Sequence, residues 1–135
     1  MRWALPATMA IGLWLAPAAA PSAQDRVVYR ETGTASFYGH ELAGQKTASG
    51  ERYDPAALTA AHPTLPLGAR VTVVALASGR SVTVEVNDRG PFTGGRMIDL
   101  SLRAARALGI VKSGVARVRI SATREQLRPR ESNAD

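Results

Sequence analysis

Two valine-rich runs that lie close together in the chain constrain the fold most strongly. The runs are RVTVVAL (70–76) and SVTVEVN (81–87), and β-branched residues at this density favour strands. In the second run, valines alternate with polar residues, which is the period of a strand that buries one face. The intervening ASGR carries a glycine suited to a tight turn, so we predict an antiparallel β-hairpin.

The rest of the central region also favours short strands. Three further runs have strand composition: GTASFYG (33–39), LTAAH (58–62) and GVARVRISA (114–122). One helix is predicted, SLRAARALG (101–109), with its apolar residues on one face, Gly109 at its end and Asp99 or Ser101 as its N-cap. Short strands around one short helix predict a mainly β fold, a small closed barrel.

The N-terminal residues have the composition of a secretory signal peptide, which we place at 1–23. Arg2 precedes an apolar run from Ala4 to Ala20, and small residues follow. A membrane anchor is the alternative, but the run is short for a span and contains two prolines. We expect cleavage after Ala20 or two to three residues later, and export to the periplasm or the extracellular space.

Composition sets the other domain boundaries. A polar segment at 24–32 is predicted to be a linker, 33–123 a single folded unit, and the charged, proline-bearing segment 124–135 a disordered tail. We expect a monomer, since no pattern in the sequence indicates oligomerisation.

The lack of cysteine excludes several classes of protein and site. No disulfide can form, and no N-terminal cysteine can carry a lipid anchor, so the chain is not expected to be a lipoprotein. With two histidines and no HxxxH spacing, we expect no metal site.

The positive charge indicates an anionic partner. The formal net charge is +6, or +5 once Arg2 has been removed with the signal peptide. Because the arginines are scattered rather than clustered, we expect no nucleic acid partner and favour an anionic cell envelope.

Asp88 is the most informative candidate for chemistry. It follows the second valine-rich run directly and has the parity of Val82, Val84 and Val86. A regular strand would therefore point this carboxylate toward the barrel interior at its mouth, where shielding from water suits a general acid. NDRG is equally good turn chemistry, so the alternative is that Asp88 only binds loop backbone.

A second polar segment adds further candidates. TASGERYDPAALTAAH (47–62) contains Glu51, Asp54 and His62, which together could face a polymer groove. The alternatives are that Asp54 caps a turn before a proline and that Glu51 is merely solvated. Tyr38 and Tyr53 could stack on sugar rings or pack in the core.

Five motifs, in order along the chain, resemble the RlpA (rare lipoprotein A) family. The motifs are GTASFYG, KTASGERYD, LTAAHPTLPLGARV, SVTVEVNDRGPF and RMIDLSLRAARALG. The resemblance implies a six-stranded double-psi β-barrel with one or two short helices. It also implies an endolytic peptidoglycan lytic transglycosylase, a lyase without cofactor. Such an enzyme prefers glycan strands lacking stem peptides and leaves 1,6-anhydro-MurNAc ends.

Carried over residue by residue, the resemblance assigns catalytic positions to Asp88, Glu51, Asp54 and His62. Asp88 would serve as acid and then base, Glu51 and Asp54 would position sugar hydroxyls or stabilise developing positive charge, and His62 would orient a carboxylate. Asp99, in IDLS, would be a groove residue or a helix cap, and we favour the cap. The sequence has no lipobox cysteine, and we expect no C-terminal SPOR domain of the kind that many members carry.

The two arginines beside the acidic motif suggest how denuded glycan could be chosen. Arg89 and Arg96 could bind the lactyl carboxylates of muramic acid, since guanidinium groups match carboxylates in bidentate geometry. The alternative is that they pair with Asp99 or Glu85 and brace the loop. The partners implied are peptidoglycan glycan strands and cell-division or envelope proteins.

Two other functions are compatible with the same residues. One is a non-catalytic, expansin-like module that binds wall glycan, and the other is a hydrolase acting on a different β-linked glycan.

Overall fold

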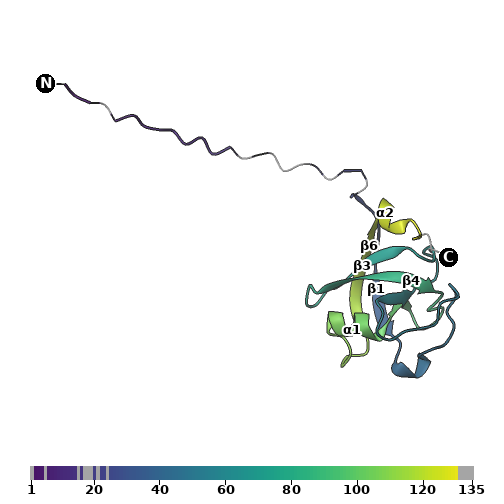
Figure 1. Ribbon diagram of the computed structural model, residues 1–135. Helices are drawn as coiled ribbons and strands as arrows, with labels where there is room; N and C mark the ends of the chain where they lie inside the picture. Colours follow the sequence, from purple (N-terminus) through teal and green to yellow (C-terminus); the bar gives the residue numbers. More distant parts are fainter. Residues whose placement is uncertain are drawn as a thin grey trace.

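The computed structural model describes residues 2–4, 6–14, 16, 20, 22–23 and 25–130, and its elements lie between Val27 and Leu127 (Figure 1). In chain order they are β1 (Val27–Phe37), η1 (His40–Leu42), β2 (Thr59–Ala61), β3 (Arg70–Ala75), β4 (Ser81–Asp88), β5 (Arg96–Leu100), α1 (Leu102–Leu108), β6 (Ala116–Thr123) and α2 (Arg124–Leu127).

The six strands form a closed barrel in the order β1-β5-β2-β4-β3-β6. Two neighbouring pairs, β1 with β5 and β2 with β4, are parallel, and the other four pairs are antiparallel. Closure leaves no open sheet edge, which removes a common route to aggregation. The predicted hairpin is confirmed as the antiparallel pair β3–β4.

Alternation along the strands fills the barrel interior with aliphatic side chains. The largest of those almost fully buried are Val71, Val73, Val84, Val86, Ile98, Leu100, Val118 and Ile120. Burying one such side chain contributes about 1.5–3 kcal/mol. Helix α1 packs against β4 and β1, with Leu102, Ala104, Ala105 and Leu108 facing the core.

The predicted linker at 24–32 is wrong over most of its length. Strand β1 begins at Val27, and it pairs with β6 from Val27–Thr123 to Ala35–Ala116. Most side chains from 27 to 32 are exposed, so their polarity resembles that of a linker although their backbone lies in the barrel wall.

The predicted disordered tail also needs correction. Residues 124–127 form α2, which begins with a capping box between Thr123 and Gln126. The chain then returns to the barrel, where Arg130 donates its backbone N–H to Gly68 O (3.3 Å). Residues 131–135 lie outside the described residues, so the prediction for them stays a prediction.

The predicted signal peptide lies partly outside the described residues, at positions 1, 5, 15, 17–19 and 21. Its described residues extend away from the barrel (Figure 1). Among the described residues, no helix has both the length and the apolar character needed to cross a membrane.

Candidate active site

A bulge near the end of β4 determines where Asp88 points. In the pairing with β2, Ala60 lies opposite Val86 but Ala61 lies opposite Asp88, so Asn87 is an extra residue. Ala60 and Ala61 face opposite sides of their strand, and therefore so do Val86 and Asp88. The prediction that Asp88 shares the inward face of the valines is wrong. The carboxylate lies half-buried on the outer face of the barrel wall.

Strand register places Asp88 in a polar row with a second aspartate. Ala61 is paired with both Asp88 and Asp99, and Asp99 is paired with Ser36. The row therefore crosses β4, β2, β5 and β1. Two strand spacings separate the Asp88 and Asp99 backbones by roughly 10 Å.

Asp99 belongs to this row and not to the helix terminus. Its buried carboxylate accepts a short hydrogen bond from the Ser36 hydroxyl, and Arg96 Nη1 lies 3.2 Å from the same oxygen. The N-cap of α1 is Ser101, whose hydroxyl accepts the Ala104 N–H (3.3 Å). The preference for Asp99 as the cap is wrong.

Three donors fix the Asp88 carboxylate. Oδ1 accepts the backbone N–H of Ala48 (3.0 Å) and of Arg89 (2.9 Å), while Oδ2 accepts the Tyr38 hydroxyl (3.3 Å). The bulged Asn87 supports this arrangement. Its carbonyl accepts a hydrogen bond from the Ser49 N–H (3.0 Å), which holds the neighbouring Ala48 N–H close to Asp88. With Oδ1 engaged by two N–H groups, Oδ2 is the oxygen able to exchange a proton.

Tyr38 remains a neutral phenol beside Asp88. Burial raises the pKa of Tyr38 well above its usual value, and the carboxylates of Asp88 and Asp99 raise it further. Tyr38 therefore acts as a hydrogen-bond donor and not as a base. Its ring meets that of Tyr53 edge-on, with centroids 5.3 Å apart.

Asp88 opens into a pocket of about 130 Å³. The pocket is lined by Tyr38, Leu42, Gln45, Lys46, Thr47, Tyr53 and Asp88. Tyr53 is 4% exposed, its hydroxyl donates to Tyr38 O (3.3 Å) and it accepts the Leu102 N–H (3.1 Å). Tyr53 thus supports the pocket wall and offers no free face to a sugar, while Tyr38 is less buried.

Glu51 lies in a second hollow, which is linked to Asp88 through Ala48, whose N–H is accepted by Asp88 Oδ1. Ala48 and Ser49 line this hollow together with Glu51, Glu85 and Arg130, among others. Glu51 is exposed and accepts the Ser49 hydroxyl (3.2 Å). Burial raises the pKa of Glu85, and the nearby Glu51 charge raises it further. This hollow therefore has an acidic side next to Asp88.

Asp54 makes the contact that the turn interpretation predicts. Its Oδ1 accepts the Ala56 N–H (2.9 Å), and its side chain borders a different hollow with His40, Arg103 and Arg106. The lining of this hollow, like that of the hollow at Glu51, shares no residue with the pocket at Asp88.

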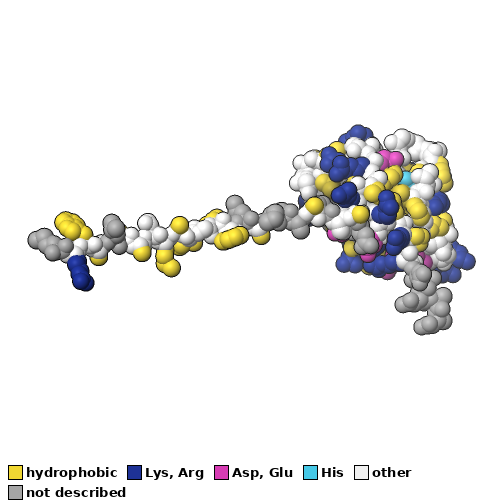
Figure 2. Space-filling model, turned by 90° about the horizontal axis from the view of Figure 1, so that it is seen from above, with side chains coloured by type: hydrophobic (Ala, Val, Ile, Leu, Met, Phe, Trp, Pro, Cys, Tyr) yellow, Lys and Arg dark blue, Asp and Glu magenta, His cyan; other side chains and the backbone are white. Residues whose placement is uncertain are grey.

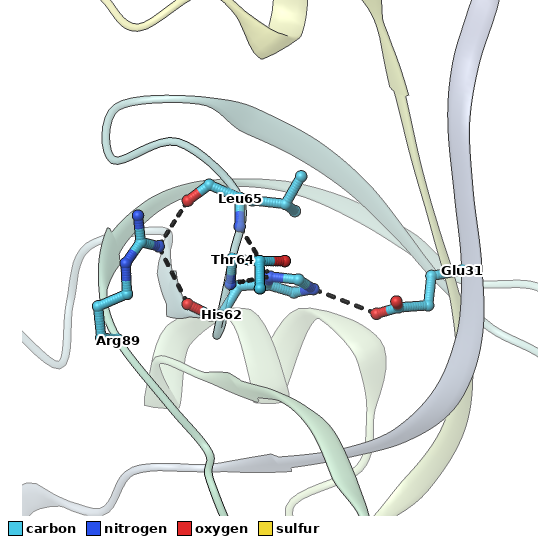
Figure 3. A network of polar contacts seen from close by, with 5 residues as sticks. All are labelled: Glu31, His62, Thr64, Leu65 and Arg89. Atoms are coloured by element: carbon cyan, nitrogen blue, oxygen red, sulfur yellow. Dashed lines mark hydrogen bonds and ion pairs between the residues drawn. The ribbon is translucent and has the colours of Figure 1, made fainter.

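His62 is turned away from the three candidate carboxylates. The ring is buried, its Nε2 lies 3.1 Å from Glu31 Oε1, and its Nδ1 accepts the N–H groups of Thr64 and Leu65 (3.1 Å each) (Figure 3). His62 does orient a carboxylate, but it is that of Glu31. Sequence reasoning missed Glu31, because its strand had been assigned to the linker.

Both arginines of the acidic motif are engaged within the protein. Arg89 Nη1 donates to the carbonyls of His62 (3.1 Å) and Leu65 (2.5 Å) (Figure 3). Arg96 pairs with Asp99 and donates to Ser36 Oγ (2.9 Å), as the bracing alternative expects. The side chain of Arg96 is still 36% exposed.

Cationic side chains are prominent on the face of the barrel seen in Figure 2. Figure 2 shows Lys and Arg side chains spread over the visible face of the barrel, with few acidic groups among them. In the part of the chain that the structure describes, no three His, Asp or Glu side chains are arranged to hold a metal ion.

Comparison with known sequences identifies the family. Residues 30–120 match the DPBB_1 family model, described as lytic transglycolase. The probable endolytic peptidoglycan transglycosylase RlpA of Synechocystis is 62% identical over 86 residues, covering 64% of this chain and 27% of that protein. The Pseudomonas aeruginosa endolytic peptidoglycan transglycosylase RlpA is 54% identical over 96 residues, covering 71% of this chain and 28% of that protein. The Neisseria meningitidis protein of the same name is 51% identical over 104 residues, covering 77% of this chain and 42% of that protein.

These relatives are longer proteins, and the chain spans about a quarter to two fifths of their length. Among solved structures, the Streptomyces papain inhibitor matches with a TM-score of 0.56 at 24% identity, covering 71% of this chain and 96% of the inhibitor. The apo expansin of Clavibacter michiganensis matches with a TM-score of 0.57 at 21% identity, covering 71% of this chain and 52% of the expansin. These likenesses confirm the double-psi β-barrel fold. The family model and the sequence relatives show that the chain belongs to the RlpA family of lytic transglycolases.

Proposed function

We propose that this barrel is an endolytic peptidoglycan lytic transglycosylase that cleaves MurNAc–GlcNAc bonds in exported form. The proposal depends mainly on the Asp88 carboxylate. Its Oδ1 is fixed by two backbone N–H groups, and its Oδ2 faces a pocket beside the neutral phenol of Tyr38. The names of the relatives support the same reaction. The proposal includes action in the envelope, on strands lacking stem peptides.

In this mechanism one carboxyl group acts twice. Asp88 Oδ2 donates its proton to the bridging oxygen as the bond from C1 of muramic acid breaks. The C6 hydroxyl of the same sugar then bonds to C1, and Oδ2 accepts the hydroxyl proton. The product is a 1,6-anhydro ring, and Asp88 ends with the proton it started with. Because the nucleophile is intramolecular, no second carboxylate is needed to activate water.

The neighbours of Asp88 have supporting roles in this reaction. The Tyr38 hydroxyl stabilises the carboxylate formed between the two proton transfers, since its raised pKa keeps it a donor. Glu51 borders the second hollow, where it can contact sugar hydroxyls. Arg96 is the guanidinium available to a lactyl carboxylate, whereas Arg89 is occupied by two carbonyls.

A second candidate function is a non-catalytic wall-binding module. The observation that favours it is the fold, since a Clavibacter michiganensis expansin mutant with the same barrel was solved in complex with cellohexaose. That chain matches with a TM-score of 0.54 at 21% identity.

Product analysis separates the candidates. The purified protein is incubated with denuded glycan strands, beside Asp88→Asn and a control, Glu125→Gln, in exposed α2. Mass spectrometry should find anhydro-muramic ends that fall by about 10²- to 10⁴-fold in Asp88→Asn and stay unchanged in the control. Reducing ends would indicate a hydrolase. Intact strands retained by the protein in a pull-down would indicate a binding module.

A further inference from the structure

We propose that His62 and Glu31 are positioning residues for Asp88 and take no direct part in proton transfer. His62 builds the turn at residues 62–65, and this turn anchors Arg89, whose backbone N–H holds Asp88 Oδ1. The inference rests on the proposed function only for what the Asp88 carboxylate does, because the contacts themselves exist without substrate.

The hydrogen bonds fix the tautomer of His62. Its Nδ1 accepts two backbone N–H groups, those of Thr64 and Leu65, and therefore carries no proton. The proton of the neutral ring is on Nε2, which donates to Glu31 Oε1 at 3.1 Å. With 2% of the residue exposed, neither nitrogen is left to meet a substrate.

The turn transmits this arrangement to Asp88 at two points. The carbonyls of His62 and Leu65 both accept hydrogen bonds from Arg89 Nη1, and these two bonds fix the position of the guanidinium (Figure 3). The same residue then presents its backbone N–H to Asp88 Oδ1 at 2.9 Å. The backbone N–H of His62 donates to the carbonyl of Asp88 at 3.1 Å. Both the carboxylate and the backbone of Asp88 are thereby fixed.

The Glu31 end of the pair is open to solvent, while the His62 ring is packed inside. Glu31 is 43% exposed and borders a hollow of about 590 Å³, which Arg96 and Arg117 also line. Tyr29 meets the His62 ring edge-on, with centroids 6.5 Å apart. A second proton on His62 would have to occupy Nδ1, where it would confront two N–H donors.

Two substitutions at His62 separate positioning from proton transfer. In His62→Asn the amide oxygen replaces Nδ1 as acceptor for the two N–H groups, whereas in His62→Gln the amide reaches the place of Nε2. If His62 positions the turn, kcat of His62→Asn should fall by about three- to tenfold, because this variant keeps the acceptor for the turn but loses the contact with Glu31. That of His62→Gln should fall by about 10- to 100-fold at nearly constant KM. An equal loss in both variants, near the 10²- to 10⁴-fold typical of a lost acid or base, would overturn the proposal.

The second histidine supplies the matched control. His40 is exposed in η1, and the sequence contains two histidines, so His40→Asn leaves His62 as the single imidazole. This variant should keep wild-type activity. Its ¹⁵N NMR spectrum at neutral pH should show an unprotonated Nδ1 and a protonated Nε2. A ring protonated on Nδ1 at neutral pH would contradict the proposal.

Glu31 provides a test that does not depend on the buried ring. Glu31→Gln keeps an oxygen that can accept from Nε2, while Glu31→Ala removes it. Amide hydrogen exchange at Arg89 should be faster in Glu31→Ala and in His62→Gln and near wild type in Glu31→Gln. Unchanged exchange in all three would overturn the proposal. If the wild type forms no anhydro ends, the proposed function fails, and the exchange and tautomer results still decide this inference.

Discussion

At the scale of single residues, the Asp88 carboxylate has two unlike oxygens. Oδ1 is held by backbone N–H groups that no side-chain substitution removes directly, while Oδ2 faces the Tyr38 hydroxyl. This asymmetry lets one oxygen serve as an anchor and the other as the site of proton exchange. A carboxylate that must act first as acid and then as base benefits, because its orientation does not change between the two steps.

Replacing Tyr38 by Phe tests the donor to Oδ2. Tyr38→Phe keeps the ring but loses the hydroxyl that stabilises ionised Asp88, so kcat should fall by about 10-fold with KM within about twofold. Steady-state kinetics on denuded glycan measures both constants. Tyr53→Phe is the contrast, since Tyr53 bonds Leu102 N–H and should lose about 1 kcal/mol of stability with little change in kcat. The same kinetic loss in both variants would refute the role given to Tyr38.

Residue identity could be predicted at this scale, but residue orientation could not. Asp88 stands out because a carboxylate follows a valine-rich strand and because its motif resembles a known family. Its direction depends on one extra residue at Asn87, which hydrophobic alternation cannot reveal when Asn87 is itself buried. Glu31 carried no signal, because an exposed polar residue looks the same in a linker and on the outside of a barrel.

At the scale of elements, the segment joining β5 to α1 depends on one buried hydroxyl. Ser101 is fully buried and accepts the N–H groups of Ala104 and Thr59 (3.3 Å each). It also donates to Ala57 O (2.6 Å). The N-cap residue Ser101 therefore also links α1 to the segment that leads into β2, through hydrogen bonds with Thr59 and Ala57.

Removing this hydroxyl should cost more than a helix cap alone. We expect Ser101→Ala to lower the free energy of unfolding by about 2–3 kcal/mol, since a cap is worth about 1 kcal/mol and two further half-buried groups, Thr59 N–H and Ala57 O, lose their partner. Thr123→Ala, at the start of exposed α2, should cost about 1 kcal/mol. Urea denaturation of both variants measures the difference. Equal losses would mean that Ser101 acts only as a cap.

The hairpin and the helix could be predicted because their hydrophobic patterns are strong. Strand β5 could not be predicted because its pattern is weak. RMIDL has one charge at its first residue and another at its fourth, and it follows two glycines. It therefore lacks both the alternation of an exposed strand and the apolar run of a buried one. The barrel requires it because it lies between β1 and β2, and its charges Arg96 and Asp99 belong to the polar row.

At the scale of the whole molecule, all three tyrosines have raised pKa values. Burial is the largest cause for each, and Tyr29 reaches about 12, helped by the charge of Glu31. A fold that raises the pKa of a phenol stabilises its neutral form. That stability is fully present below the unfolded value of 10.0 and is lost as pH rises toward the folded value.

Alkaline titration should display this effect. Absorbance of the phenolate should remain low in the folded protein at pH 10, where about half of the tyrosines of the urea-unfolded chain are ionised. The denaturation midpoint should then fall as pH rises from 10 toward 12. A folded-state titration centred at pH 10 would contradict the burial of the three rings.

The pairing of the first strand with the last has a consequence for synthesis. β1 contacts β6 along most of its length, and β5, its other partner, also comes late in the chain. The barrel cannot close until β6 has left the exit tunnel of the ribosome. The nascent chain therefore stays open until both β1 and β6 are available, so folding of the barrel follows the synthesis of all six strands.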